Sequence, residues 1–167
     1  IERERAESPK LPEWLYWSAQ VATLEGRVED ALKLLDEYVQ ARPDDPAGLF
    51  ARAQQNMARG AGSAAIADLE QLKARSPGAL DLRPRMLLAF AYEGTQRKDA
   101  ALRELESLLD EFPQSQLAAQ ELVSAYVRSD RLADAERVLT AQINRTPDAR
   151  GAAWLTLRAD LARRGGN

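Results

Sequence analysis

A pattern of about 34 residues recurs four times along the chain, and it constrains the fold more than any other feature. In its first copy, Ala31, Leu35 and Tyr38 share one face of a predicted helix, and Pro43 follows five residues later. The same slots return in three further sets: Ala65, Leu69, Leu72 and Pro77; Ala101, Leu105, Leu108 and Pro113; Ala135, Leu139, Gln142 and Pro147. Only Gln142 departs from the apolar pattern. The spacing predicts four amphipathic helices, and hence an all-α chain built from repeats.

Each of these helices is preceded by a second segment with helical periodicity. Small residues recur where two helices of a pair would cross, and a larger one takes that place in the fourth pair: Ala19, Ala53, Ala89 and Val123. Turns between paired helices are predicted at Gly26, Gly60, Gly94 and the Ser129-Asp130-Arg131 segment. The prolines end each second helix, because proline lacks an N–H donor and restricts the residue before it. The sequence thus predicts four helix pairs, at about residues 12–45, 46–79, 82–115 and 116–149.

This arrangement resembles the tetratricopeptide repeat family, whose unit is a 34-residue helix–turn–helix with small residues at the helix crossing and a closing proline. The resemblance covers about residues 12–149 and rests on four copies in register. It implies a right-handed superhelix, or solenoid, of antiparallel helix pairs in a single array over residues 12–167. The family's large aromatic residue in the first helix is replaced here by Leu15, Leu49, Arg85 and Ala119.

Residues 149–164 are expected to form a further helix that caps the last pair. Leu155, Leu157 and Leu161 can cover that pair, while Arg158, Arg163 and Arg164 face water and a Gly-Gly dipeptide ends the helix.

The other end is predicted to differ, with residues 1–11 as an extension and an apolar line of Trp14, Trp17 and Val21 on the outer side of the first helix. A terminal repeat should be polar on that side. Either the Ile1–Leu11 segment folds back over the indole rings, or further repeats pack on them. Both alternatives, and the absence of an initiating Met, favour a piece of a longer parent protein.

The resemblance implies a concave face that is lined by the first helix of each pair and that holds extended or helical peptides. The residues expected to project inward are Tyr16, Gln20, Phe50, Gln54, Met86, Phe90, Gln120, Ser124, Trp154 and Arg158. Amides can pair with a peptide backbone, and flat side chains can cover its apolar residues. The alternative for the Phe and Met residues is ordinary core packing.

A second binding mode of the resembled family grips a C-terminal carboxylate through Lys, Asn and Arg at set places. The matching places here hold Tyr16, Gln20, Ala51, Arg83 and Leu87. Only Arg83 fits, so that specificity for chaperone tails is not expected.

The composition argues against catalysis. The chain has neither Cys nor His, which removes thiolate chemistry, the commonest general base and the commonest metal ligand. Adjacent carboxylates such as Asp36 and Glu37 point to different sides of a helix. We therefore expect a non-enzymatic protein without cofactor or metal.

The net charge and the hydropathy of the chain limit the classes of partner that it can bind. The net charge of −3 offers no basic field for nucleic acid, and no apolar run approaches the roughly 20 residues that span a bilayer. The expected partner is a protein or peptide.

The sequence thus favours a protein–protein interaction module that binds a peptide or partner helix in its concave groove. The alternative is a structural spacer or assembly segment of a larger multi-repeat bacterial envelope protein, of the kind that serves polysaccharide secretion or pilus assembly. Trp14 and Trp17 would then pack end to end against further repeats or a second copy. The compartment stays open between cytoplasm and periplasm, and only this analogy of class favours the periplasm.

Overall fold

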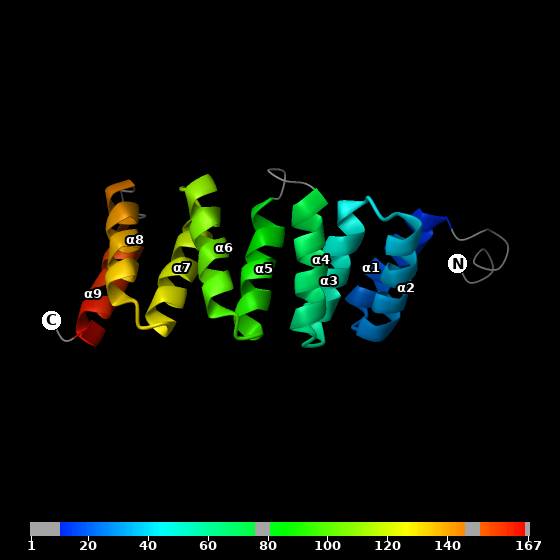
Figure 1. Cartoon of the computed structure of the whole chain (residues 1–167), viewed down its shortest axis with the longest axis horizontal. Coiled ribbons are helices and arrows are strands. Elements are labelled where there is room, and N and C mark those ends of the chain that lie inside the picture. Colours follow the sequence, from blue (N-terminus) through cyan, green and yellow to red (C-terminus); the bar gives the residue numbers. More distant parts are fainter. Residues whose placement is uncertain (1–10, 76–80, 146–150, 166–167) are drawn as a thin grey trace. The chain divides into compact units, whose positions relative to one another are not determined.

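The chain is all-α in the computed structural model, which describes residues 11–75, 81–145 and 151–165. These residues form nine helices (Figure 1): α1 Pro12–Leu24, α2 Val28–Ala41, α3 Pro46–Ala58, α4 Gly62–Arg75, α5 Leu82–Gly94, α6 Lys98–Glu111, α7 Gln116–Arg128, α8 Leu132–Arg145 and α9 Gly151–Gly165. These nine helices are consistent with the four predicted helix pairs and the additional C-terminal helix. The extension up to residue 10 and the closing prolines Pro77 and Pro147 lie outside the described residues.

The helices group into two compact units, Ile1–Thr95 and Gln96–Asn167. Within the first unit each helix packs on the next, from α1 to α5, and within the second unit the same holds from α6 to α9. This is the nearest-neighbour packing that a stack of helix pairs requires. The helices of the predicted third repeat, α5 and α6, fall in different units, and a single array over residues 12–167 stays a prediction.

Small residues let the helices of the first unit approach closely. The predicted crossing residues Ala19, Ala53 and Ala89 are buried. A second close approach, between pairs, was not predicted: a Cβ atom on Gly48 of α3 would lie 2.7 Å from Cδ1 of Tyr38 and 3.1 Å from Cγ2 of Val39, both on α2. The first helix of a pair therefore packs directly against the second helix of the pair before it.

The turns within the four pairs share one backbone feature. The residue 14 positions after the start of each first helix has a positive φ angle: Gly26 (72°), Gly60 (79°), Gln96 (62°) and Asp130 (57°). The prediction of a turn at Gly94 is therefore corrected, because Gly94 is the last residue of α5 and the left-handed position belongs to Gln96. The two-residue insertion before α5 shifts this turn relative to the glycine.

Substitution by alanine is expected to have opposite effects at two of these glycines. Gly26→Ala should lower the free energy of unfolding by about 1 kcal/mol, because a Cβ atom is strained in the left-handed region. Gly94→Ala should raise it by about 0.5–1 kcal/mol, since the site is helical and open around the new Cβ. Urea unfolding followed by circular dichroism measures both. Equal signs would contradict the assignment of the turn.

Hydrogen bonds between neighbouring pairs recur in register. The Tyr92 hydroxyl on α5 donates to Glu70 on α4 at 2.7 Å, and one repeat later the Tyr126 hydroxyl on α7 donates to Glu106 on α6. Burial and then this bond to Glu106 raise the pKa of Tyr126 to about 12. The phenol therefore remains a donor at neutral pH, and it ties the first helix of one pair to the second helix of the pair before.

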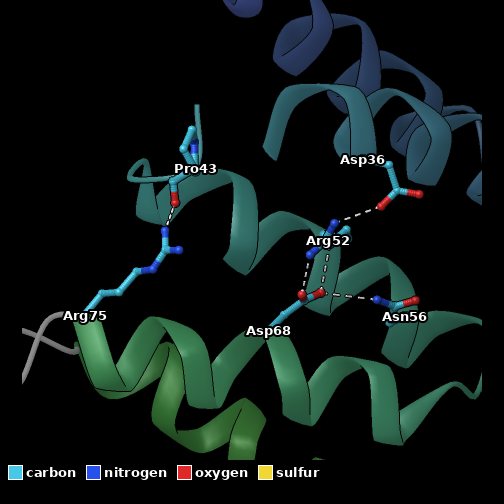
Figure 2. A network of polar contacts seen from close by, with 6 residues as sticks. All are labelled: Asp36, Pro43, Arg52, Asn56, Asp68 and Arg75. Carbon is cyan, nitrogen blue, oxygen red and sulfur yellow. Dashed lines mark hydrogen bonds and ion pairs between the residues drawn. The ribbon is translucent and has the colours of Figure 1, made fainter. Parts of the chain in front are cut away.

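At the contact between the first and second pairs, an arginine makes the bond between pairs that tyrosines make at the two contacts above. Arg52 of α3 donates two hydrogen bonds to the Asp68 carboxylate of α4, at 2.6 and 3.1 Å, and one to Asp36 of α2 at 2.9 Å (Figure 2). Asn56 donates to Asp68 at 3.3 Å, while its own Oδ1 is buried without a hydrogen-bond partner among the described residues. Arg52 thus joins three consecutive helices, and its bond with Asp68 raises its pKa.

Candidate functional site

In the first unit, the candidate surface lies along the first helices α1, α3 and α5. Phe90 on α5 is 37% exposed and Gln54 on α3 is exposed, whereas Tyr16, Gln20 and Phe50 are half-buried. We call these five residues the first-helix face. They combine aromatic rings with amides, and that they hold a peptide stays a prediction.

Phe50 is held at this surface by contacts on two sides. Part of its ring packs against the core, beside Leu49 and Leu72. The guanidinium carbon of Arg83, an exposed residue of α5, lies 5.9 Å from the ring centroid, which places a cation over the aromatic face. Arg83 is thus a part of this surface that the sequence identified only as one place of a carboxylate clamp.

Tyr16 is fixed by other aromatic rings. Its ring centroid lies 5.2 Å from that of Tyr38 and 5.5 Å from that of Trp17, and its side chain packs beside Leu35 and Ala51. The Tyr38 hydroxyl donates to Asp45, and burial followed by this bond raises the pKa of Tyr38 to about 12. Tyr16 is therefore held by contacts with α1, α2 and α3.

Two of the predicted contact residues are placed in the interior. Met86 is 4% exposed and Trp154 is 2% exposed, so neither side chain is open to a partner in this structure. For Trp154 the reason is register: α9 begins 35 residues after α7 instead of 34. The extra residue turns Trp154, together with Leu161, onto the buried stripe of α9.

In the second unit, the candidate site is a hollow of about 240 Å³ between α7 and α9. Its lining is formed by Val123, Ser124, Val127, Arg128, Leu157, Asp160 and Leu161. Ser124 was predicted to face a partner, whereas the residues from α9 were not. The walls are mostly apolar, and Arg128 and Asp160 add one charge of each sign.

The other predicted residues of this unit do not join that hollow. Gln120 is half-buried on α7 and does not line it. Arg158 lines a second, more open hollow of about 520 Å³ between α8 and α9, together with Glu136 and Leu155. The structure therefore separates Arg158 from Ser124, for the same reason of register that buries Trp154.

Apolar side chains also line the outer side of α1, as predicted. Trp14 is 41% exposed, Trp17 65%, Val21 51% and Leu24 88%. We call these four residues the α1 stripe. Leu24 extends the apolar line that the sequence indicated by one helical turn.

No helix among residues 11–75, 81–145 and 151–165 is long and apolar enough to cross a membrane. Over the same ranges, no group of three or more acidic side chains is arranged to hold a metal ion.

Comparison with known proteins identifies the repeat. The model of the tetratricopeptide repeat matches residues 99–161, and the helices before that match continue the same spacing. The chain contains tetratricopeptide repeats. No curated protein matches the chain.

Solved structures share the fold of this tetratricopeptide-repeat protein at low sequence identity. MamA from Desulfovibrio magneticus RS-1, from residue 41 to its end, gives a TM-score of 0.72 at 23% identity over 83% of this chain and 78% of its own. YrrB, described as having an unusual peptide-binding site, gives 0.70 at 11% identity over 95% and 83%. The first such domain of Spaghetti (RPAP3), bound to an HSP90 peptide, gives 0.64 at 19% identity over 73% and 93%.

Proposed function

We propose that this tetratricopeptide-repeat protein is a non-enzymatic interaction module that binds an extended or helical segment of a partner protein on its first helices. The observation that carries the proposal is the first-helix face, where Phe90 and Gln54 are exposed and the Phe50 ring is fixed by Arg83. Rigid aromatic rings supply contact area at a small loss of conformational entropy, and amides can bond to a peptide backbone.

The hollow between α7 and α9 supports the same function in the second unit. At about 240 Å³ it is smaller than the roughly 300–1,000 Å³ of small-molecule pockets. Its size and apolar walls suit an anchoring side chain of a peptide better than a cofactor. Arg128 and Asp160 could bond to polar groups of that peptide beside the anchor.

Two structural neighbours make a peptide ligand a reasonable class. YrrB is described as having a peptide-binding site, and the Spaghetti domain is bound to an HSP90 peptide. The places that a carboxylate clamp would need hold a single basic residue, Arg83. We therefore propose an internal segment as the ligand rather than a free C-terminus.

The proposal is tested with a peptide selected from a random phage-displayed library on the immobilised full chain and then measured by isothermal titration calorimetry. We expect the double substitution Phe90→Ala and Gln54→Ala to weaken binding at least about tenfold, or roughly 1.4 kcal/mol.

A matched control removes the same residue types elsewhere. Trp14→Ala with Gln40→Ala deletes one exposed aromatic ring and one exposed amide on α1 and α2. This pair should leave the affinity within about twofold, a difference below roughly 0.5 kcal/mol. Equal losses from both pairs, or a larger loss from the control, would overturn the assignment of the first-helix face.

A second candidate function is a spacer or assembly segment, in which the main contacts join copies or repeats rather than hold a peptide. The α1 stripe favours it, because large apolar side chains on one exposed helix face are typical of interaction surfaces. Under this candidate, the control pair above would change assembly and leave peptide binding intact.

A further inference from the structure

We infer that the α1 stripe is a self-association surface, on which α1 pairs antiparallel with α1 of a second copy of this chain. Trp14, Trp17, Val21 and Leu24 follow one another at spacings of three, four and three residues. This is the a/d spacing of a seam between two helices over two heptads. All four side chains are exposed, by 41% to 88%.

The equivalent face of α3 shows what such a surface does in this fold. Thirty-four residues after the first three residues of the stripe lie Gly48, Ala51 and Gln55, and all three are buried. Gly48 touches α2, and Ala51 clusters with Leu35 of α2. This side of a first helix is therefore a place where another helix packs.

The face of α5 repeats the observation. Ala91, which corresponds to Val21, is fully buried in a cluster with Ile66 and Leu69 of α4. Among the described first helices of the first unit, α1 alone presents this face as large exposed side chains.

The side chains of the α1 stripe are too large for the second helix of a preceding pair to pack on them as α2 packs on α3. At the α2–α3 contact the large residues, Tyr38 and Val39, come from α2, and α3 supplies Gly48. On α1 an indole stands at the place of that glycine. A preceding second helix with Tyr and Val in the same slots would collide with Trp14 and Trp17, since close-packed helices cannot absorb two large groups at one point.

The α1 helix of a second copy avoids this collision when the two helices run antiparallel. In that orientation Trp14 faces Leu24 of the other copy, and Trp17 faces Val21, so each indole meets an aliphatic side chain. A parallel arrangement would set indole against indole. The antiparallel pairing is two-fold symmetric and closes on itself, as most homodimer contacts do.

Charge permits this pairing. The only charged residue within α1 is Glu13, and its carboxylate is engaged by Arg42 of the same chain. A two-fold contact brings like residues near one another, and a neutral stripe avoids the repulsion that the net charge of −3 would otherwise favour. The α1 stripe shares no residue with the first-helix face, and the pairing does not depend on the proposed function.

Sedimentation equilibrium of the full chain over a roughly hundredfold range of concentration tests the pairing. We expect a reversible dimer with a dissociation constant on the order of micromolar, because two heptads bury a small interface. Trp17→Glu should weaken it at least about tenfold with unchanged helicity, while Leu117→Glu, which alters an exposed leucine of α7, should not.

Engineered cysteines test the orientation, since the natural chain has none. A mixture of Trp17→Cys and Val21→Cys proteins should oxidise to a mixed dimer in several-fold higher yield than either protein alone, because position 17 faces position 21 across the seam. Efficient cross-linking of each variant with itself would indicate parallel helices and overturn the pairing.

Two further results would also overturn it. The first is a wild-type chain that stays monomeric at every concentration. The second is a monomer whose α1 stripe instead binds a synthetic helix with the sequence of Val28–Ala41, which would assign the face to a partner helix. In either case the effect of Phe90→Ala on peptide binding would be unchanged, so failure here is distinct from failure of the proposed function.

Discussion

Leu69→Ala is expected to lower the free energy of unfolding by about 2–5 kcal/mol, the range for large-to-small changes at sites that cannot collapse around the cavity. Leu69 of α4 is 1% exposed and packs in the cluster that joins α3, α4 and α5. Because each pair is stabilised by its neighbours, the loss should spread beyond α4. Chemical denaturation followed by circular dichroism measures the change.

A leucine on the surface provides the matched control. Leu117→Ala removes the same atoms from a side chain of α7 that is 50% exposed, and it should change the free energy of unfolding by less than about 0.5 kcal/mol. A loss below about 1 kcal/mol for Leu69→Ala would mean that the α3–α5 cluster is not a close-packed core.

Asp68→Ala should destabilise the chain by about 2–4 kcal/mol, the second largest effect that we expect. The Asp68 side chain is 7% exposed and accepts hydrogen bonds from both Arg52 and Asn56 (Figure 2). Its removal leaves the Arg52 guanidinium, 21% exposed, without its main counter-charge. Urea denaturation provides the measurement.

The other carboxylate on the same guanidinium serves as the control. Asp36 lies 2.9 Å from Arg52, but its side chain is 56% exposed. Solvent screens that pair, so Asp36→Ala should cost less than about 1 kcal/mol. If both substitutions cost the same, burial would not be what makes the Asp68 bond strong.

The helix pairs were predictable from the sequence because two independent signals agree. Apolar spacing locates the helices, and the recurring small residues and prolines fix their register. The buried Ala19, Ala53 and Ala89 show how little freedom that register leaves. The helices of the described residues are therefore consistent with four pairs and a further C-terminal helix.

Details that depend on single insertions were not predictable in the same way. Gly94 is a plausible turn residue, yet the left-handed position falls on Gln96, where no residue preference points to it. One additional residue before α9 likewise rotates Trp154 from the predicted surface into the interior. A one-residue change rotates a helix by about 100°, which is enough to exchange exposed and buried faces.

The candidate site was predicted in outline and not in its contacts. The amide and aromatic slots follow from the repeat, whereas the Arg83–Phe50 contact and the α7–α9 hollow depend on distances between helices. The Arg52 network is a similar case, since Asp36 and Asp68 are far apart in sequence and meet only when three helices pack. No local sequence pattern indicates where residues of three helices come into contact.

Hydrogen exchange with mass spectrometry, on the full chain with and without a selected peptide, tests most directly whether partners bind on the first helices. The result we predict is slower amide exchange on peptide binding in α1, α3 and α5, with α2 and α4 unchanged, since only the former present the first-helix face. Protection confined to α2 and α4 would contradict this account.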